Sequence, residues 1–249
     1  MENFGGNIVR SIDMTKTGRQ DFASGPYDYY MTVVEDGNEL EIKQLNSFTA
    51  YFLDVLERSP KVSANNQIEL VQGDVLQLDM QTVKLSVNGG SVRFLVSGVK
   101  EYFCREPQMS ITHYKDIYKV EKPWGHELWL NREHPAYCLK QVSLKAGFRT
   151  SLQYHTTKQE TNVIFEGEAY IHYKSNSNIE NNDVQETDID RTIIKPISSV
   201  DISPNVVHRL ESIKDCVLYE TSTPQLNDVI RIEDDTNRSN GRVESEHKA

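Results

Sequence analysis

Gly147-Phe-Arg-Thr-Ser-Leu-Gln-Tyr-His-Thr-Thr-Lys-Gln-Glu160 and Ser203-Pro-Asn-Val-Val-His208 are the two most informative stretches of this chain. Side chains alternate between the two faces of a strand, so Gln153 and His155 point the same way if this part is extended. The residues that follow are long enough for a hairpin connection, after which Glu160 opens the next strand. His208 follows a turn-forming Pro-Asn pair. Only a closed β-barrel could bring all four side chains together.

These four side chains form a reasonable ligand set for a divalent metal. Two imidazoles, a carboxylate and an amide oxygen suit Zn, Fe, Mn, Co or Ni, and there is no thiolate to favour a structural zinc site. Such ligands must lie within about 2.0–2.2 Å of one ion. A single histidine in a strand is more commonly a hydrogen-bonded residue than a ligand, so the spacing alone leaves both interpretations open.

Short β-type runs dominate the rest of the sequence. They are rich in Val, Ile, Leu, Phe and Tyr, and they are separated by Gly, Asn, Asp and Pro. Many short strands with frequent turns favour an all-β fold of the sandwich, jelly-roll or barrel type. The runs span residues 29–34, 50–56, 67–70, 75–78, 92–96, 136–144, 161–165, 169–173, 200–202 and 216–220.

Composition excludes some classes of protein. The formal net charge is −10, and without a basic patch such a chain is a poor nucleic-acid binder. An anionic substrate remains compatible, because a few local cations or a metal can reverse the field inside a pocket. No apolar run approaches a membrane span, and the first residues lack the layout of a signal peptide, so we expect a cytoplasmic protein without membrane contact. The three cysteines form no CxxC pair and are expected to be reduced thiols.

A weak internal repeat relates the two halves. When residues 74–96 are laid beside residues 199–221, Val83-Lys-Leu falls on His208-Arg-Leu and Ser91-Val-Arg-Phe falls on Cys216-Val-Leu-Tyr. Two copies of one β fold would explain this, with Val83 in place of the histidine. All seven histidines lie at or beyond His113, so the first copy cannot build a histidine-based site. A chance likeness of two β-rich segments is the alternative.

The second half resembles the cupin superfamily, specifically the cupin domain of type II phosphomannose isomerases. The resemblance covers about residues 118–236. The family ending usually continues into Tyr-Gly-Arg, whereas this chain has Asp235-Thr-Asn-Arg238, and the nucleotidyltransferase domain of the bifunctional members is missing. The motifs that carry the resemblance are Glu121-Lys-Pro-Trp-Gly-His-Glu127, Gly147-x-Arg-x-Ser-Leu-Gln-x-His155 with Glu160 and Gly167, Pro204-x-x-x-His208, Ser222-Thr-Pro224 and Asp228-Val-Ile-Arg-Ile-Glu-Asp234.

The resemblance implies a double-stranded β-helix, or cupin, jelly-roll barrel, and with the repeat it implies a bicupin. We expect a degenerate cupin-like β domain without a metal site over residues 1–115, a metal-binding cupin domain over 116–236 and a disordered tail over 237–249. The polar segment 174–191 is expected to loop out between two strands. Exposed strand edges are compatible with a homodimer.

The resemblance also implies an activity. In phosphomannose isomerases the residues that match Gln153, His155, Glu160 and His208 bind one divalent metal, usually zinc. We therefore expect a metal-dependent isomerase that acts on a phosphorylated sugar of the mannose 6-phosphate type. Arg231 and Lys140 are the candidate catalytic residues, and Arg149 and Lys122 the candidate substrate-binding residues. Two alternatives remain open: a non-catalytic cupin that binds metal or sugar, and an Fe(II)-dependent cupin oxygenase.

Overall fold

The computed structural model describes residues 2–4, 7–13, 16–23, 25–132, 134–175 and 189–247. Strands make up most of the described residues, and they form two antiparallel sheets in two compact units. We call residues 13–118 and 130–139 the first barrel, and residues 1–12, 119–129 and 140–249 the second barrel.

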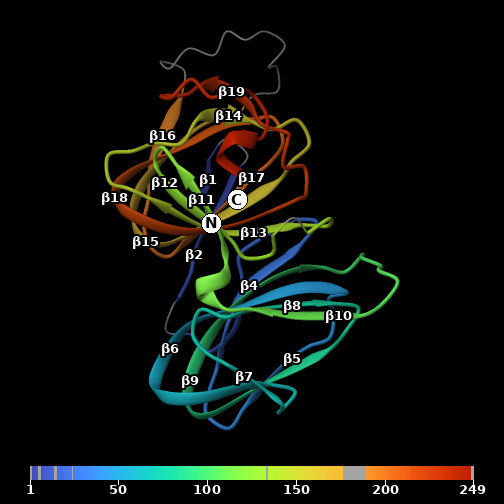
Figure 1. Cartoon of the computed structure of the whole chain (residues 1–249). Helices are drawn as coiled ribbons and strands as arrows, with labels where there is room; N and C mark the ends of the chain where they lie inside the picture. The colour runs from blue at the N-terminus through green and yellow to red at the C-terminus, as the bar shows by residue number, and fades with distance from the viewer. Residues whose placement is uncertain are drawn as a thin grey trace. The chain divides into compact units, whose positions relative to one another are not determined.

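The first barrel is built around one long pair of antiparallel strands. Strands β6 (Ser47–Ala64) and β9 (Val83–Val99) pair along most of their length, as Figure 1 shows, and the remaining strands extend the sheet from them. The strand order is β10-β8-β6-β9-β4-β3, with β7 on β6 and β5 on β9. The other strands are β3 (Gly18–Asp21), β4 (Asp28–Val34), β5 (Glu39–Ile42), β7 (Ile68–Leu70), β8 (Val75–Asp79) and β10 (Gln108–Thr112), and a 3-10 turn, η1 (Tyr114–Asp116), follows.

The second barrel repeats this plan around the antiparallel pair of β15 (Glu160–Ser175) and β18 (Val206–Ser222). The strand order is β1-β2-β17-β15-β18-β13-β12-β11, with β16 on β15 and with β14 on β18 and β19. The other elements are β1 (Glu2–Phe4), β2 (Asn7–Ser11), β11 (Tyr118–Lys122), β12 (Gly125–Trp129), β13 (Cys138–Leu144), β14 (Leu152–Tyr154), β16 (Asp190–Ile194), β17 (Ser198–Ile202), β19 (Ile230–Glu233) and the 3-10 helix η3 (Glu244–His247).

Each barrel has its own apolar core. Buried Val, Leu and Phe side chains of β6, β8 and β9 fill the first barrel together with Ile42 of β5, and Val83 is among them. In the second barrel Trp124, Ile164, Leu210 and Leu218 belong to the core. The alternation of apolar and polar residues along the strands produces these faces, because every second side chain of a strand points inward.

Gly167 allows the long strand pair of the second barrel to bend. Its φ is +86°, a left-handed conformation, and a Cβ at this position would lie 2.2 Å from the carbonyl oxygen of Asp215. A side chain would therefore clash with the paired strand as well as strain the backbone.

The compact units differ from the expected domain boundaries. Strand β2 pairs with β17, so the start of the chain completes the second barrel. Residues 130–139 lie in the first barrel although their flanking strands belong to the second. Strand pairing supports the first assignment, and side-chain contacts such as that of Thr49 with Tyr137 (2.8 Å) support the second. Most of the expected polar loop, residues 176–188, lies outside the described residues.

Residues 237–247 fold against the second barrel, which differs from the disordered tail that their polar composition suggests. Arg238, Gly241 and His247 line its cavity. The backbone amide of Gly241 donates to the carbonyl of Val229 (2.8 Å). Ion pairs with buried side chains, described below, outweigh the low apolar content of this segment.

Candidate metal centre

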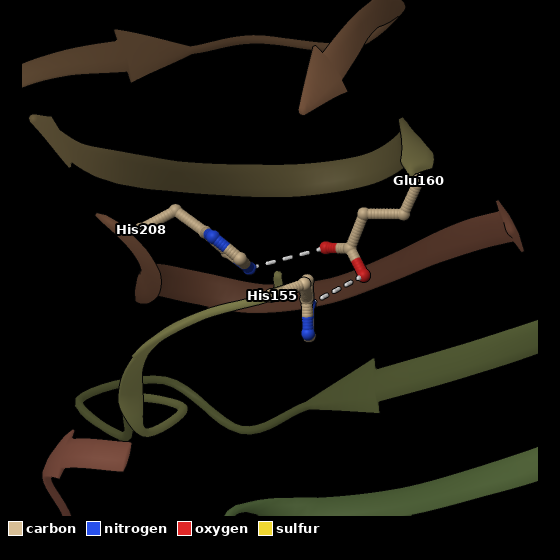
Figure 2. Close-up of side chains that lie close together, drawn as sticks. All are labelled: His155, Glu160 and His208. Carbon is tan, nitrogen blue, oxygen red and sulfur yellow. Dashed lines mark ion pairs between the residues drawn. The ribbon is translucent and has the colours of Figure 1, made fainter. Parts of the chain in front are cut away.

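His155, Glu160 and His208 converge inside the second barrel (Figure 2). The Glu160 carboxylate lies between the two imidazoles, with 3.3 Å from Oε2 to Nε2 of His155 and 3.2 Å from Oε1 to Nε2 of His208. All three residues are at most 4% exposed. Their potential ligand atoms lie within 4.8 Å of one another, a spacing from which one cation could bind all three after small side-chain adjustments.

Strand pairing explains this convergence. Gln153 on β14 lies opposite His208 on β18, and Glu160 is the first residue of β15. His155 follows two residues after Gln153, so both lie on the same face of an extended chain. Gln153, Glu160 and His208 all line the cavity of the barrel, which places the expected amide ligand beside the three-residue cluster.

Backbone contacts orient both imidazoles for metal binding. Nδ1 of His155 donates to the carbonyl of Asp228, and Nδ1 of His208 donates to the carbonyl of Val206 (3.0 Å). Each donation leaves Nε2 with a lone pair, and neither buried Nε2 has a hydrogen-bond partner. Buried acceptors without partners are costly, and a cation at this point would satisfy both.

The protonation states also fit a metal. Burial and the nearby Lys158 ammonium lower the pKa of His155, which favours the neutral imidazole that binds metals. Burial opposes the ionisation of Glu160, but the Lys158 ammonium outweighs it and holds the pKa of Glu160 well below its ordinary value. The neutral His155 imidazole, the His208 imidazole and a carboxylate form a donor set that fits a divalent ion.

Asp228 secures the turn that carries His155. Its carboxylate accepts backbone N–H bonds from Thr156 (2.9 Å), Lys158 (2.9 Å) and Thr157 (2.6 Å). Burial of Asp228 opposes ionisation, but these donors dominate and lower its pKa. One residue thus positions His155 through its carbonyl and the following turn through its side chain.

The cavity beside the candidate ligands is strongly charged. Its volume is about 140 Å³. Among the described residues that line it, six are cationic and three are carboxylates. The cations are Lys122, Lys140, Lys158, Arg231, Arg238 and Arg242, and the carboxylates are Glu127, Glu160 and Glu220.

Ion pairs link these groups into a chain. Lys158 contacts Glu160 (2.6 Å) and Glu220 (3.0 Å), and Lys140 contacts Glu220 (3.1 Å) and Glu127 (3.5 Å). Burial of Glu127 opposes ionisation, but Lys140, Lys122 and the indole N–H of Trp129 outweigh it and lower its pKa to about 2. Buried ion pairs stabilise a fold poorly because desolvation is costly, so such a network favours a functional origin.

Three of the four other candidate residues lie at this cavity. Lys140, Lys122 and Arg231 line it. Arg231 is anchored by Ser151 Oγ (Nε, 3.0 Å) and by the carbonyl of Gly241 (Nη1, 2.8 Å).

Arg149 is not among the described residues that line the cavity. Its guanidinium instead binds Asp235 (2.8 Å) and Glu233 (2.8 Å) in an ion pair that is partly exposed.

Sequence reasoning missed Lys158, Glu220 and Arg238. Lys158 stands two residues before Glu160, so an extended chain would place both on one face. Arg238 lies seven residues after Arg231 in a segment that composition alone suggested was disordered. Nothing in the neighbourhood of Glu220 distinguishes it from other strand residues.

Comparison with known proteins gives similarity of structure alone. No known family's sequence profile matches the chain, and no curated protein matches it in sequence. Among the described residues, none of the helical turns has the length and apolar character needed to cross a membrane.

Three solved structures illustrate the likeness. The oxalate decarboxylase of Lactobacillus farciminis, in a formate complex, has a TM-score of 0.63 at 10% identity and covers 92% of this chain and 87% of its own. GK1651 from Geobacillus kaustophilus has a TM-score of 0.63 at 11% identity, and the match covers 87% of this chain and 94% of GK1651. The salicylate 1,2-dioxygenase of Pseudaminobacter salicylatoxidans has a TM-score of 0.56 at 8% identity, with 80% and 71% covered.

Such low identities establish the fold and leave the reaction open. The two neighbours that are named as enzymes carry out different reactions, a decarboxylation and a dioxygenation. The expected fold class is confirmed: the chain has the all-β jelly-roll fold of the cupins, with two antiparallel sheets.

Proposed function

We propose that the second barrel is a metal-dependent site for a phosphorylated sugar, and that its reaction is an aldose–ketose isomerisation of the mannose 6-phosphate isomerase type. The observation that supports this most directly is the position of the His155–Glu160–His208 cluster at one end of a cationic cavity. The motif resemblance to type II phosphomannose isomerases supplies the choice of reaction.

The charge of the cavity favours an anionic substrate. Behind the lining residues, three further carboxylates form ion pairs with lining cations: Asp234 with Arg238, Glu246 with Lys122 and Glu244 with Arg242. The cations and carboxylates then balance, and a divalent ion would add an excess of two positive charges. In the low dielectric of a buried cavity this excess attracts an oxyanion such as phosphate.

The size of the cavity favours a small polar substrate. Its volume of about 140 Å³ lies below the range of about 300–1,000 Å³ that is usual for drug-sized ligands. Polymers are therefore poor candidates. A monosaccharide that enters with its reactive end toward the metal ligands fits this description better.

The proposed reaction moves one proton between adjacent carbons. A proton leaves C2 of the aldose and one is delivered to C1, while the hydroxyl proton on O2 is transferred to O1, so no atom or electron is gained or lost. A divalent ion bound by Gln153, His155, Glu160 and His208 would polarise the carbonyl and hydroxyl oxygens of the substrate.

Glu220 is the candidate for the proton transfer at carbon. It lines the cavity between Lys140 and Lys158 and does not belong to the ligand set. Glu127 is the poorer base, because its pKa of about 2 leaves it with little affinity for a proton. Lys140 holds both carboxylates in place, and Arg231 would stabilise negative charge that develops on the substrate oxygens.

The test is a turnover assay with defined metals. Purified metal-free protein is loaded in turn with Zn, Fe, Mn, Co or Ni, incubated with mannose 6-phosphate and assayed for fructose 6-phosphate. We expect metal-dependent turnover that His155→Ala abolishes. His172→Ala is the matched control, because His172 lies in the same barrel but pairs with Glu211 (2.6 Å) and does not line the cavity.

Other outcomes would support other functions. Tight metal binding without turnover for any metal would contradict the isomerase and favour a binding protein. Oxygen consumption with the Fe(II)-loaded protein would favour an oxygenase, since two histidines and a carboxylate are also the ligands of non-haem iron oxygenases.

A further inference from the structure

A carboxylate from η3 forms ion pairs with two cations of the cavity wall. Glu246 lies 2.7 Å from Nζ of Lys122 and 3.6 Å from Nη1 of Arg238. Lys122 and Arg238 line the cavity, whereas Glu246 does not. The contact therefore joins groups of the cavity wall to a carboxylate from outside it.

The two cations are poorly hydrated, and Lys122 depends on this partner. The side chains of Lys122 and Arg238 are 9% and 11% exposed. The other carboxylate near Lys122 is Glu127, at 3.7 Å, and Lys140 shares it. Arg238 is held by Asp234 (2.7 Å). Lys122 would therefore need a replacement anion if Glu246 moved away.

Arg231 adds a third cation next to this pair. Nε of Arg231 and Nη2 of Arg238 both donate to Ser151 Oγ, each at 3.0 Å. The charge of Arg238 contributes, after burial, to a lowered pKa of Arg231. Two guanidiniums that converge on one hydroxyl repel each other, and a bound oxyanion would relieve this repulsion.

The segment that carries Glu246 is attached unevenly. Residues 239–241 are fixed by hydrogen bonds from Arg231. Its backbone amide donates to Oδ1 of Asn240 (2.8 Å), and its guanidinium donates to the carbonyl of Gly241 (2.8 Å). Helix η3 has no buried residue. Its ring contact is between His247 and Trp129, with 5.2 Å between centroids. The part beyond Gly241 can therefore move at a lower cost than the part before it.

We propose that Lys122 and Arg238 form the subsite for the phosphate group of the substrate, and that the Glu246 carboxylate fills this subsite until the phosphate displaces it. Carboxylate and phosphate oxygens accept from the same ammonium and guanidinium donors, and phosphate carries the higher charge and more acceptors. The inference rests on the proposed function in one respect, that the substrate is phosphorylated.

The test compares anion affinities of the full chain loaded with zinc. Inorganic phosphate, mannose 6-phosphate and unphosphorylated mannose are titrated by calorimetry. Tryptophan fluorescence is followed in parallel, since the ring of His247 packs edge-on against Trp129. We expect Glu246→Gln to bind both phosphate ligands about three- to tenfold more tightly than the wild type, because an internal competitor has been removed. Mannose binding should not change.

Matched variants separate displacement from a change in overall charge. Glu121→Gln makes the same charge change at a carboxylate that is 74% exposed and pairs with Lys119, which does not line the cavity, so its phosphate affinity should equal that of the wild type. Lys122→Met and Arg238→Met should weaken phosphate binding at least tenfold. Thermal unfolding of each variant checks that it is folded at the temperature of the titration.

The contrary results are clear. Unchanged or weaker phosphate binding by Glu246→Gln would overturn the proposal, as would tightening for inorganic phosphate but not for mannose 6-phosphate. Unchanged binding by Lys122→Met and Arg238→Met would show that phosphate binds elsewhere. These measurements do not depend on turnover. If Glu246→Gln binds phosphate more tightly but the wild type shows no isomerase activity, the proposed reaction alone is refuted. If the wild type turns over but Glu246→Gln does not bind phosphate more tightly, the subsite alone is refuted.

Discussion

The two barrels pair corresponding strands in a similar way but differ in the side chains at the paired positions. Gln153 pairs with His208 in the second barrel, and Ile42 pairs with Val83 in the corresponding strands of the first. The first residues of the long strands also correspond. Glu160 lies opposite Ile202 and Ser222, and Ser47 lies opposite Asp79 and Val99.

This correspondence shows how little separates an apolar core from a candidate metal centre. Ile42 and Val83 belong to the apolar core of the first barrel. Ser47 is fully buried and donates to Asp79 (2.5 Å), beside His134. Within the part of the chain that the structure describes, His155, Glu160 and His208 form the one cluster with metal-ligand spacing. The backbone supports both solutions, and the side chains at a few registers decide between them.

The largest expected effect comes from making the second barrel resemble the first. His208→Val places the residue of the first barrel in the candidate site. We expect zinc affinity to fall by roughly 1,000-fold, about 4 kcal/mol, because one of four ligands is lost. Calorimetric titration of metal-free protein measures this, and circular dichroism should show an unchanged strand content. His172→Val is the control, and retention of wild-type affinity by His208→Val would refute the ligand assignment.

The reverse exchange should harm stability without creating a metal site. Val83→His buries an imidazole among apolar side chains, so we expect a loss of about 3 kcal/mol in the free energy of unfolding. No zinc site should appear, since Ile42 and Ser47 offer no carboxylate. Denaturant unfolding followed by circular dichroism tests this, with Lys84→His as an exposed control on the same strand. A stable Val83→His variant would mean that this core is less tightly packed than it appears.

A smaller expected effect concerns acid sensitivity, which the charged cavity should confer on the second barrel. The pKa of Glu127 is lowered from 4.5 to about 2, so its carboxylate stabilises the fold fully above about pH 4.5 and loses this contribution as the pH falls toward 2. Over that pH interval we expect the free energy of unfolding of Glu127→Gln to fall by about 2 kcal/mol less than that of the wild type.

Tryptophan fluorescence can measure this, because Trp124 and Trp129 are the two tryptophans of the chain and both belong to the second barrel. Glu121→Gln, which changes an exposed carboxylate on the neighbouring strand β11, should behave like the wild type. If Glu127→Gln and the wild type unfolded along the same acid curve, the ion pairs of Glu127 would contribute nothing to stability.

Much of the fold could be predicted, because apolar runs and turn residues mark strands locally. Every predicted run falls in or overlaps a strand. The full length of the long strand pairs could not be predicted. In β6 the residues Glu57, Arg58 and Lys61 are polar and exposed, yet they stay in the ladder because their backbones pair with β9 on either side of a bulge. Backbone pairing does not depend on side-chain polarity, so composition cannot show it.

The candidate site was predictable to a different degree for each residue. Gln153, His155 and Glu160 lie within eight positions of one another, and strand alternation with a short turn brings them together. Lys158 and Glu220 were not predicted, because their importance arises from a contact across 62 residues. Arg149 shows the opposite case, since a promising motif position is used for an ion pair with Asp235.

The amino-acid sequence by itself determined the all-β class and the four candidate ligands, because these depend on residue type and local alternation. The tertiary structure alone decided that strand β2 completes the second barrel, that six cations line one cavity, and that residues 237–247 form part of its wall. Those features depend on which strand edges pair and which charges must be buried together. Such long-range choices minimise the free energy of the whole fold and leave no local pattern in the chain.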